Sequence, residues 1–277
     1  MFQKEKVRHR LQIYRHLTGG LARVREDFGD LLFPPPAGCG YCGSELMPPL
    51  MPWWTPENAV DQTLCRRCLE QVVFTSGPGC ARCGRPEQED RLCVFCRNDI
   101  CRVSGGSATV YEGIIPELTR RLKFKGARQL AAALGRMAAI TGMKVAAGWP
   151  VTAVVPVPLH QERLAERGYN QAQLIAGEVA RWLGRPLWSD ILLRTRNTKP
   201  QSGLDIADRA KNIEGAFVAV DVKNLSRRSI LLVDDVLTTG ATLTAAAAAL
   251  LVAGAGSVRF VTASVTVAPP QHWKGDY

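Results

Sequence analysis

The sequence lacks a Gly-Lys dipeptide, and residues 102–277 contain no cysteine. The first absence excludes the P-loop of nucleotide hydrolases, in which a lysine follows a glycine and reaches the phosphates. Residues 1–6 lead into no apolar segment with a small-residue cleavage site, so the sequence predicts no secretory signal. Because disulfide frameworks are typical of exported proteins, we expect a cytoplasmic protein whose nine cysteines serve another purpose.

Charge is absent from one long stretch, residues 236–258. This stretch begins with a turn rich in Gly and Thr and ends in Gly254-Ala255-Gly256, which leaves an Ala-rich helix over about residues 241–253. A helix needs about 20 apolar residues to cross a bilayer. The sequence therefore predicts no transmembrane segment.

Acidic residues are outnumbered by basic ones, 25 against 35, which gives a net charge of +10 and an isoelectric point near 9.4. This balance favours anionic partners, among which phosphorylated metabolites, nucleic acids and acidic proteins remain open. A solvated basic surface without a function is equally compatible with it. At 277 residues the chain is long enough for one large domain or two modest ones with a hydrophobic core.

Eight of the nine cysteines form C-x-x-C pairs. The pairs are Cys39 and Cys42, Cys65 and Cys68, Cys80 and Cys83, and Cys93 and Cys96. Two such turns complete a tetrahedral Cys₄ site, so we predict two structural Zn²⁺ ions, each held by two successive pairs. A cross-braced pairing, an iron-sulfur cluster and redox dithiols remain alternatives. Cys101 is predicted to be a small buried hydrophobe.

Composition divides the chain into three parts. Residues 1–33 are predicted to form a helical extension, because their apolar residues recur at steps of three and four. Pro34-Pro35-Pro36 opens the cysteine module, residues 34–101, which contains an apolar, proline-rich insertion at residues 47–54. Residues 102–277 have the composition of an α/β domain.

Strand and helix patterns alternate in this last part. Strands are predicted at residues 107–111, 151–156, 230–235 and 257–267, and helices at residues 116–124, 128–140, 170–183 and 241–253. Asn170 before the third helix and Gly184 after it are typical capping residues. The alternation predicts an α/β fold with a mostly parallel sheet and helices on both faces.

The most informative stretch follows the aliphatic run Ile230-Leu231-Leu232-Val233, which is typical of a strand buried on both faces. Asp234 and Asp235 end this run, and ligands of parallel sheets bind beyond the carboxyl ends of the strands. Two carboxylates can accept hydrogen bonds from vicinal hydroxyls, and the following turn can present backbone N–H groups and a helix start to an anion. A buried strand with an ordinary polar turn would explain the aliphatics, but not adjacent carboxylates followed by three threonines around a glycine.

The order of strand, acidic pair and Thr-Thr-Gly-x-Thr turn resembles the phosphoribosyl pyrophosphate loop of type I phosphoribosyltransferases. The resemblance implies that Asp234 and Asp235 are catalytic residues that hold the ribose hydroxyls. It also implies that the turn binds the 5′-phosphate through Thr238, Thr239, Gly240, Ala241 and Thr242. Mg²⁺ would bridge the pyrophosphate and the sugar, since this ion is usually held by substrate phosphates and one or two carboxylates.

Two further loops are candidates for the same site. Val157 and Pro158 follow the strand at residues 151–156, with Arg163 and Arg167 behind them. If that strand neighbours the acidic strand, these residues can hold the pyrophosphate. Residues 194–204 are polar, basic and turn-rich, which suits a mobile lid. Its candidate residues are Arg196, Lys199 and Gln201.

Taken together, the motifs resemble the ComF/GntX family of competence-associated proteins over roughly residues 30–268. The motifs are the Cys pairs, Leu122-Lys123-Phe124-Lys125-Gly126, Val155-Pro156-Val157-Pro158-Leu159, Arg167-Gly168-Tyr169-Asn170-Gln171, Gln201-Ser202-Gly203-Leu204, Arg209 with Asn212, and Val233 to Thr242. The resemblance implies a zinc ribbon module joined to a type I phosphoribosyltransferase domain. It also implies a role in natural competence and the use of incoming single-stranded DNA, with a helicase-like translocase as partner.

Two functions remain open at this point. One is a phosphoribosyltransferase with an unknown acceptor. The other is a non-catalytic adaptor that binds single-stranded DNA or a translocase and is regulated by phosphoribosyl pyrophosphate.

Overall fold

The computed structural model describes residues 38–46, 60, 62–76, 79–86, 92–196, 213, 215–220 and 225–267. The predicted extension at residues 1–33, the insertion at residues 47–54 and most of the predicted lid, including Lys199 and Gln201, lie outside these ranges. None of the described helices has the length and hydropathy needed to span a membrane.

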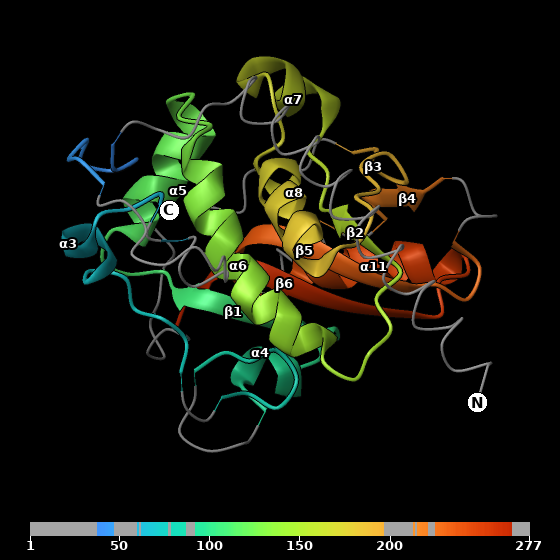
Figure 1. Ribbon diagram of the computed structural model, residues 1–277. Helices are drawn as coiled ribbons and strands as arrows, with labels where there is room; N and C mark the ends of the chain where they lie inside the picture. Colours follow the sequence, from blue (N-terminus) through green and yellow to red (C-terminus); the bar gives the residue numbers. More distant parts are fainter. Residues whose placement is uncertain are drawn as a thin grey trace, which may run out of the picture. The chain divides into compact units, whose positions relative to one another are not determined.

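A four-stranded parallel sheet forms the centre of the described chain (Figure 1), in the order β1-β6-β5-β2. The strands are β1 (Ser104–Val110), β2 (Ala153–Pro156), β5 (Ser229–Leu237) and β6 (Ser257–Val265). β5 pairs with β2 on one side and with β6 on the other, with Val233 opposite both Pro156 and Val261. The predicted α/β fold with a parallel sheet is therefore confirmed, and the acidic pair lies on an inner strand.

Helices cover both faces of this sheet. They are α5 (Ile115–Phe124), α6 (Leu130–Ala146), α8 (Gln171–Leu183) and α11 (Ala241–Val252). The short helix α7 (Gln161–Arg167) follows β2 and has no buried residue. Leu231 and Val233 of β5 join one buried cluster with α5, α6 and α8, and in Figure 1 α6 and α8 lie in front of the sheet. Ile230 and Leu232 point to the opposite face and join a second cluster with α11. The alternation explains why four successive residues of β5 are all large aliphatics.

The cysteine region forms two small modules on opposite faces of the sheet. The first contains α3 (Arg66–Leu69), and its Cys39, Leu64 and Cys68 belong to the cluster of α5, α6 and α8. The second contains α4 (Val94–Arg97) and shares the cluster of α11.

Most predicted elements are confirmed within a few residues. The caps of α8 are also confirmed: the Asn170 side chain accepts a hydrogen bond from the Ala172 N–H at 3.0 Å, and Gly184 is left-handed with φ 60°. Sequence patterns missed α7 and a separate antiparallel pair formed by β3 (Leu192–Arg194) and β4 (Phe217–Ala219). These strands have only three residues each, too few for a periodicity to show.

Gly105 of β1 allows β1 and β6 to approach closely. A Cβ atom at this position would lie 2.2 Å from the Phe260 carbonyl oxygen and 2.6 Å from the Phe260 ring. We expect Gly105→Ala to lower the free energy of unfolding by about 2 kcal/mol or more, because the backbone of β6 must move. Urea unfolding measures this change, with Gly177→Ala of α8 as the control. No atom lies within 4 Å of a Cβ at position 177, so this control should be neutral or stabilising by up to about 1 kcal/mol. Equal unfolding midpoints for the two variants would contradict the packing described here.

Candidate functional site

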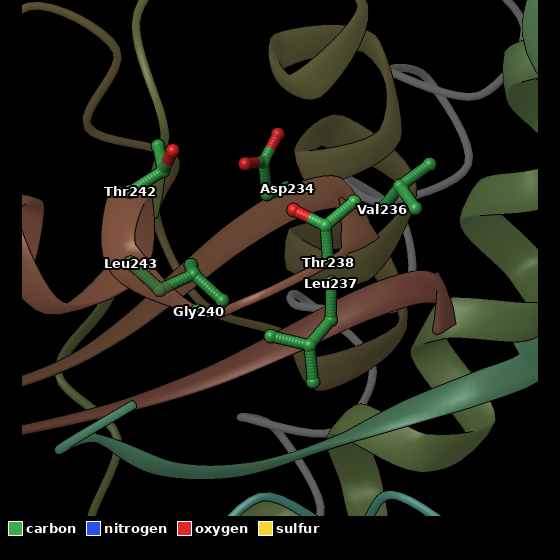
Figure 2. Close-up of a pocket in the computed structure, with 7 residues that line it drawn as sticks. All are labelled: Asp234, Val236, Leu237, Thr238, Gly240, Thr242 and Leu243. Atoms are coloured by element: carbon green, nitrogen blue, oxygen red, sulfur yellow. The ribbon is translucent and has the colours of Figure 1, made fainter. Parts of the chain in front are cut away.

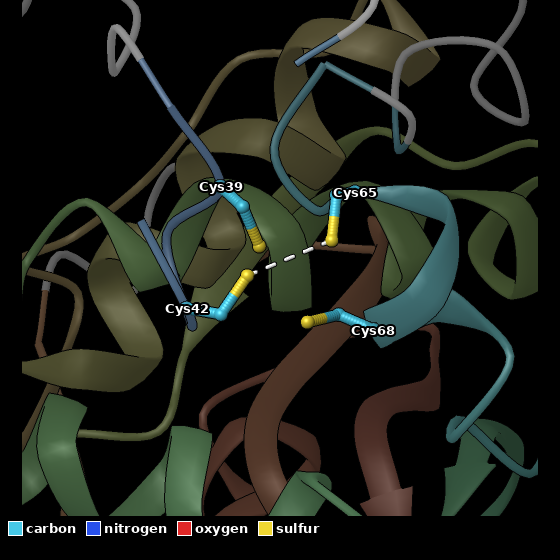
Figure 3. A group of neighbouring side chains, drawn as sticks. All are labelled: Cys39, Cys42, Cys65 and Cys68. Atoms are coloured by element: carbon cyan, nitrogen blue, oxygen red, sulfur yellow. Dashed lines mark hydrogen bonds between the residues drawn. The ribbon is translucent and has the colours of Figure 1, made fainter. Parts of the chain in front are cut away.

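The two cysteine modules each bring four sulfur atoms together. The Sγ atoms of Cys39, Cys42, Cys65 and Cys68 lie within 4.8 Å of one another, and so do those of Cys80, Cys83, Cys93 and Cys96. Figure 3 shows the four side chains of the first group, which point toward a common centre. This grouping follows chain order, as predicted, and excludes the cross-braced alternative.

The spacing of the sulfur atoms fits a tetrahedral metal site. The Cys42 and Cys65 sulfurs are 3.6 Å apart, and the Cys83 and Cys93 sulfurs are 3.7 Å apart. A tetrahedron with Zn–S bonds of about 2.3 Å has sulfur–sulfur edges of about 3.8 Å. None of the nine cysteines forms a disulfide. Both groups are therefore consistent with the closed Cys₄ sites of zinc ribbons.

Asp234 lies in a pocket beyond the carboxyl half of β5 (Figure 2). The pocket is lined by Asp234, Val236, Leu237, Thr238, Gly240, Thr242 and Leu243. Figure 2 shows the carboxylate of Asp234 and the hydroxyls of Thr238 and Thr242 on the same side of the turn, whereas Leu237 points away from them. Burial raises the pKa of Asp234 to about 8, and the charge of Asp235 adds to this rise.

Asp235 is 5% exposed and makes different contacts. Its Oδ2 lies 2.6 Å from the Lys123 Nζ, and its Oδ1 accepts a hydrogen bond from the Val236 N–H at 2.9 Å. Burial acts to raise the pKa of Asp235, but the charge and hydrogen bond of Lys123 outweigh it and leave this pKa lowered. Burial likewise acts to lower the pKa of Lys123, but the negative charge of Asp235 outweighs burial and leaves this pKa raised. The two adjacent carboxylates therefore differ: one faces the pocket and the other is held by a lysine.

Sequence reasoning assigned no role to Lys123. It lies in the last turn of α5, more than one hundred residues before the acidic pair. Lys123 lies inside the motif Leu122-Lys123-Phe124-Lys125-Gly126, which is the signal in the sequence that could have pointed to it.

The turn after β5 has the form that the motif predicts. Gly240 precedes α11 with φ +90°, a left-handed conformation that favours glycine. A Cβ there would also lie 2.5 Å from the Cβ of Cys101. The Thr239 hydroxyl accepts a hydrogen bond from the Ala241 N–H at 3.3 Å, and both residues are buried. Thr239 and Ala241 can therefore face a ligand only through their backbone, whereas Thr238 and Thr242 present hydroxyls.

The loop after β2 reaches the same edge of the sheet, because β2 pairs with β5. The Val157 N–H donates to the Val233 carbonyl at 2.9 Å, and the Asn170 side chain donates to the Val157 carbonyl at 3.0 Å. Val157 and Pro158 are thus brought to the carboxyl end of the acidic strand, as predicted.

Arginines gather around this edge. Burial lowers the pKa of Arg167, and the negative charge of Asp235 opposes that effect. Burial also lowers the pKa of Arg194, with a further contribution from Arg163 and an opposing one from Asp234. Arg167 and Arg194 therefore act electrostatically at the acidic pair, and Arg163 acts on these two arginines. Arg194 is the first residue of the predicted lid, but the structure places it in the strand β3. Arg196 is exposed.

Two Cys₄ modules attached to a parallel sheet with an acidic pair and a Thr-Gly turn define a zinc-ribbon protein with a type I phosphoribosyltransferase-like domain. Comparison with family models agrees: a double zinc ribbon domain matches residues 28–97, and a phosphoribosyl transferase domain matches residues 171–276.

Curated relatives identify the family. The chain is 34% identical to Competence protein F of Haemophilus influenzae over 188 residues, which cover 65% of this chain and 80% of that protein. It is 34% identical to Competence protein ComFC of Bacillus subtilis over 205 residues, or 70% and 80% of the two chains. It is 31% identical to the DNA utilization protein YhgH of Escherichia coli over 209 residues, or 72% and 82%. The chain belongs to the ComF family.

The raised pKa of Asp234 predicts a pH dependence of stability. An aspartate in the unfolded chain titrates near pH ~3.9, whereas the folded protein keeps the proton on Asp234 up to about pH 8. The folded state binds more protons between these values, so the free energy of unfolding falls as the pH rises through this window. We expect Asp234→Asn, which cannot ionise, to show no such fall with pH. At about pH 8 its free energy of unfolding should exceed that of the original protein by roughly 1 kcal/mol or more.

Urea unfolding of the zinc-loaded, ligand-free protein at about pH 6 and about pH 8 tests this prediction. Asp190→Asn is the matched control, because Asp190 is exposed and its charge should matter little at either pH. If Asp234→Asn is no more stable than the original protein at the higher pH, the carboxyl is not held protonated.

Proposed function

We propose that this protein binds phosphoribosyl pyrophosphate with Mg²⁺ at the pocket of Asp234 and transfers the phosphoribosyl group to an acceptor. The observation that carries the proposal is the pocket itself: one carboxylate, two threonine hydroxyls and the left-handed Gly240 lie together at the start of α11. A carboxylate suits ribose hydroxyls, and a helix start with backbone N–H groups suits a phosphate.

The ligand's ribose is assigned to Asp234 and Asp235. The Asp234 carboxylate accepts hydrogen bonds from the ribose hydroxyls, and ligand binding below about pH 8 therefore releases a proton. Asp235 stays ionised because the ammonium of Lys123 lies beside its carboxylate. The Asp235 backbone N–H donates to the Asp234 Oδ1 at 2.9 Å. Asp235 and Lys123 thus orient the carboxylate that binds the sugar.

The phosphate is assigned to Thr238 through Thr242. Thr238 and Thr242 donate their hydroxyls, and the backbone at Thr239 and Gly240 supplies N–H groups with the positive end of the α11 dipole behind them. Ala241 closes the turn, because its N–H donates to the Thr239 hydroxyl. Without a side chain at Gly240, the phosphate can approach the backbone closely.

The pyrophosphate is assigned to the loop after β2. Val157 and Pro158 bring this loop to the edge of the sheet, and Arg163, Arg167 and Arg194 supply the positive charge that binds the pyrophosphate. When the C–O bond at the anomeric carbon breaks, positive charge develops on the ribose and negative charge on the departing pyrophosphate. The protein's contribution is to hold the reactants in place and to stabilise that negative charge. Mg²⁺, when bound, would neutralise part of the pyrophosphate charge, and the Asp234 and Asp235 oxygens are donors of the kind this ion prefers.

The proposal extends to the rest of the chain. Residues 34–101 form a structural module with two Zn²⁺ ions, and residues 102–277 form the phosphoribosyltransferase-like domain. A cytoplasmic location would keep the thiolates reduced. The names of the relatives, competence protein and DNA utilization protein, support a role in natural competence and in the use of DNA. Our proposal adds that this DNA is single-stranded and that a helicase-like competence protein is a partner.

A second candidate function, the non-catalytic adaptor, is favoured by one surface feature. Phe124 is 73% exposed, and the guanidinium of Arg167 lies 5.3 Å from its ring centroid on one face. Exposed Lys125 and Arg128 follow it in the chain. An exposed ring among cations is the combination that binds single-stranded nucleic acid, through base stacking and phosphate contacts. In this function phosphoribosyl pyrophosphate regulates the binding of DNA and is not consumed.

Calorimetric titration of the zinc-loaded protein with phosphoribosyl pyrophosphate and Mg²⁺ tests the first proposal. We expect a dissociation constant of about micromolar order and a loss of at least about a hundredfold in the Asp234→Asn, Asp235→Asn double variant, because the hydrogen-bond acceptors become amides. Asp190→Asn serves again as the control and should bind normally. Absence of heat with the original protein at millimolar ligand would refute the assignment of the pocket. Pyrophosphate release in an acceptor screen then separates transfer from regulation.

Fluorescence anisotropy with a labelled oligothymidine tests the adaptor function. We expect binding that weakens steeply with salt, and about a tenfold loss of affinity in Phe124→Ala, because stacking on one ring contributes about 1–3 kcal/mol. Val252→Ala is the matched control: Val252 is 91% exposed on α11, and truncating it should change nothing. Equal affinities for Phe124→Ala and the original protein would exclude Phe124 as a stacking platform.

A further inference from the structure

The second cysteine module lies directly behind the turn that follows β5. Cys101 is the first link: it is 1% exposed, and its thiol interacts with the sulfur atoms of Cys83 and Cys96. On its other side it contacts Gly240, since a Cβ at position 240 would lie 2.7 Å from the Cys101 Sγ. One buried side chain therefore separates the second group of metal ligands from the glycine of the phosphate turn.

Arg85 is the second link and the most buried arginine among the described residues, with 0% exposure. Its backbone belongs to the metal knuckle, because the Cys80 N–H donates to the Arg85 carbonyl at 2.7 Å. Its guanidinium lies 4.6 Å from the centroid of the Phe95 ring, donates to the Thr238 carbonyl, and lies 3.3 Å from the Thr266 hydroxyl. A residue of the cysteine module thus holds the backbone of the turn.

A third link joins the same module to the first turn of α11. The Thr244 hydroxyl accepts a hydrogen bond from the Arg102 N–H at 3.0 Å and donates one to the Ile100 carbonyl at 2.9 Å. The described residues of the first cysteine module do not belong to the core cluster of α11. They pack with α5 and α6 on the other face of the sheet.

The contact of Arg85 with Thr238 has a consequence for anion binding. A trans peptide is planar, so its C=O and N–H point in opposite directions. A guanidinium that holds the Thr238 carbonyl toward the cysteine module therefore turns the N–H of Thr239 away from the module, toward the side on which the pocket lies. Arginine suits this role because its fork can satisfy two acceptors in a fixed geometry, which a lysine ammonium cannot reproduce.

We propose that the second Cys₄ module positions the phosphate loop, with Arg85 as the positioning residue, so that metal occupancy at Cys80, Cys83, Cys93 and Cys96 sets the affinity for the phosphorylated ligand. The identity of that ligand rests on the function proposed above. The positioning itself does not, because Arg85, Cys101 and Thr244 hold the loop whatever binds there. A closed Cys₄ site contributes folding free energy to its knuckles, and its loss releases the backbone that carries Arg85.

Two substitutions of neighbouring arginines test the role of Arg85. Arg85→Lys keeps the charge and all eight ligand cysteines but loses the fork, and we expect its affinity for phosphoribosyl pyrophosphate with Mg²⁺ to fall by at least about tenfold. Arg82→Lys is the matched control in the same knuckle, since Arg82 contacts the Cys96 and Cys101 carbonyls and Asp99 but not the loop. Zinc content is measured for both and should stay at the original value. An unchanged affinity in Arg85→Lys, or an equal fall in Arg82→Lys, would overturn the proposal.

Amide hydrogen exchange provides a measurement that needs no ligand. In the full chain, Cys93→Ser removes a ligand of the second site and Cys42→Ser removes an exposed ligand of the first. We expect Cys93→Ser and Arg85→Lys to speed exchange in the peptide over residues 236–244, and Cys42→Ser to leave that peptide unchanged.

The two measurements separate the possible failures. Faster exchange of the loop without any binding of phosphoribosyl pyrophosphate to the original protein would overturn the proposed function and keep the positioning role. Identical exchange of residues 236–244 in the Cys93→Ser and Cys42→Ser variants would overturn the positioning role, whether or not the ligand binds.

Discussion

Two carboxylates next to each other at the end of a buried strand are the constraint on which the rest of the site depends. Ionising both of two neighbouring carboxyl groups is energetically unfavourable in a buried environment. The protein resolves the conflict with Lys123, whose ammonium lies 2.6 Å from Asp235 and keeps that carboxylate charged. Asp234 is left with a raised pKa and faces the pocket. The sheet thereby presents one carboxyl group of raised pKa to the pocket, and the backbone N–H of the second residue holds the first carboxyl group in place.

Because the two carboxyl groups need different neighbours, elements that are far apart in the sequence must meet at this edge of the sheet. α5 supplies Lys123, the loop after β2 supplies Val157, and β5 supplies the acidic pair. Parallel strand order places β2 beside β5, and the carboxyl ends of both strands then open at the same edge. Arg167 of α7 and Arg194 of β3 lie near that edge, where the charge of Arg167 opposes that of Asp235 and the charge of Arg194 opposes that of Asp234.

Local patterns predicted those parts of the site that are local. The run from Ile230 to Val233 predicted a strand buried on both faces, and Asn170 with Gly184 predicted the ends of α8, because strand burial and helix capping depend on neighbours in the chain. The tight C-x-x-C turns likewise predicted the closeness of the two cysteines within each pair, whereas the structure was needed to exclude a cross-braced grouping of the pairs. The contacts of Lys123, Arg194 and Arg85 could not be predicted from local patterns, since each of these residues acts on a partner more than thirty residues away. The predicted extension and most of the predicted lid lie outside the described residues and stay predictions.

The positions of the two cysteine modules give the metal sites unequal relations to the acidic pair. Arg121 of α5 connects the first module to this helix, because it donates to the Tyr41 carbonyl at 2.9 Å. The last turn of α5 also carries Lys123, which forms the ion pair with Asp235. The second module is fastened to the phosphate turn by Arg85, and to α11 through Thr244. One module thus contacts the helix that carries Lys123, and the other contacts the backbone of the turn at Thr238. Both arginines lie over an aromatic ring of a cysteine module, Tyr41 or Phe95, and each donates a hydrogen bond to a backbone carbonyl. Since closed Cys₄ sites leave no coordination position open for chemistry, their contribution here is rigidity, applied to two different components of the same pocket.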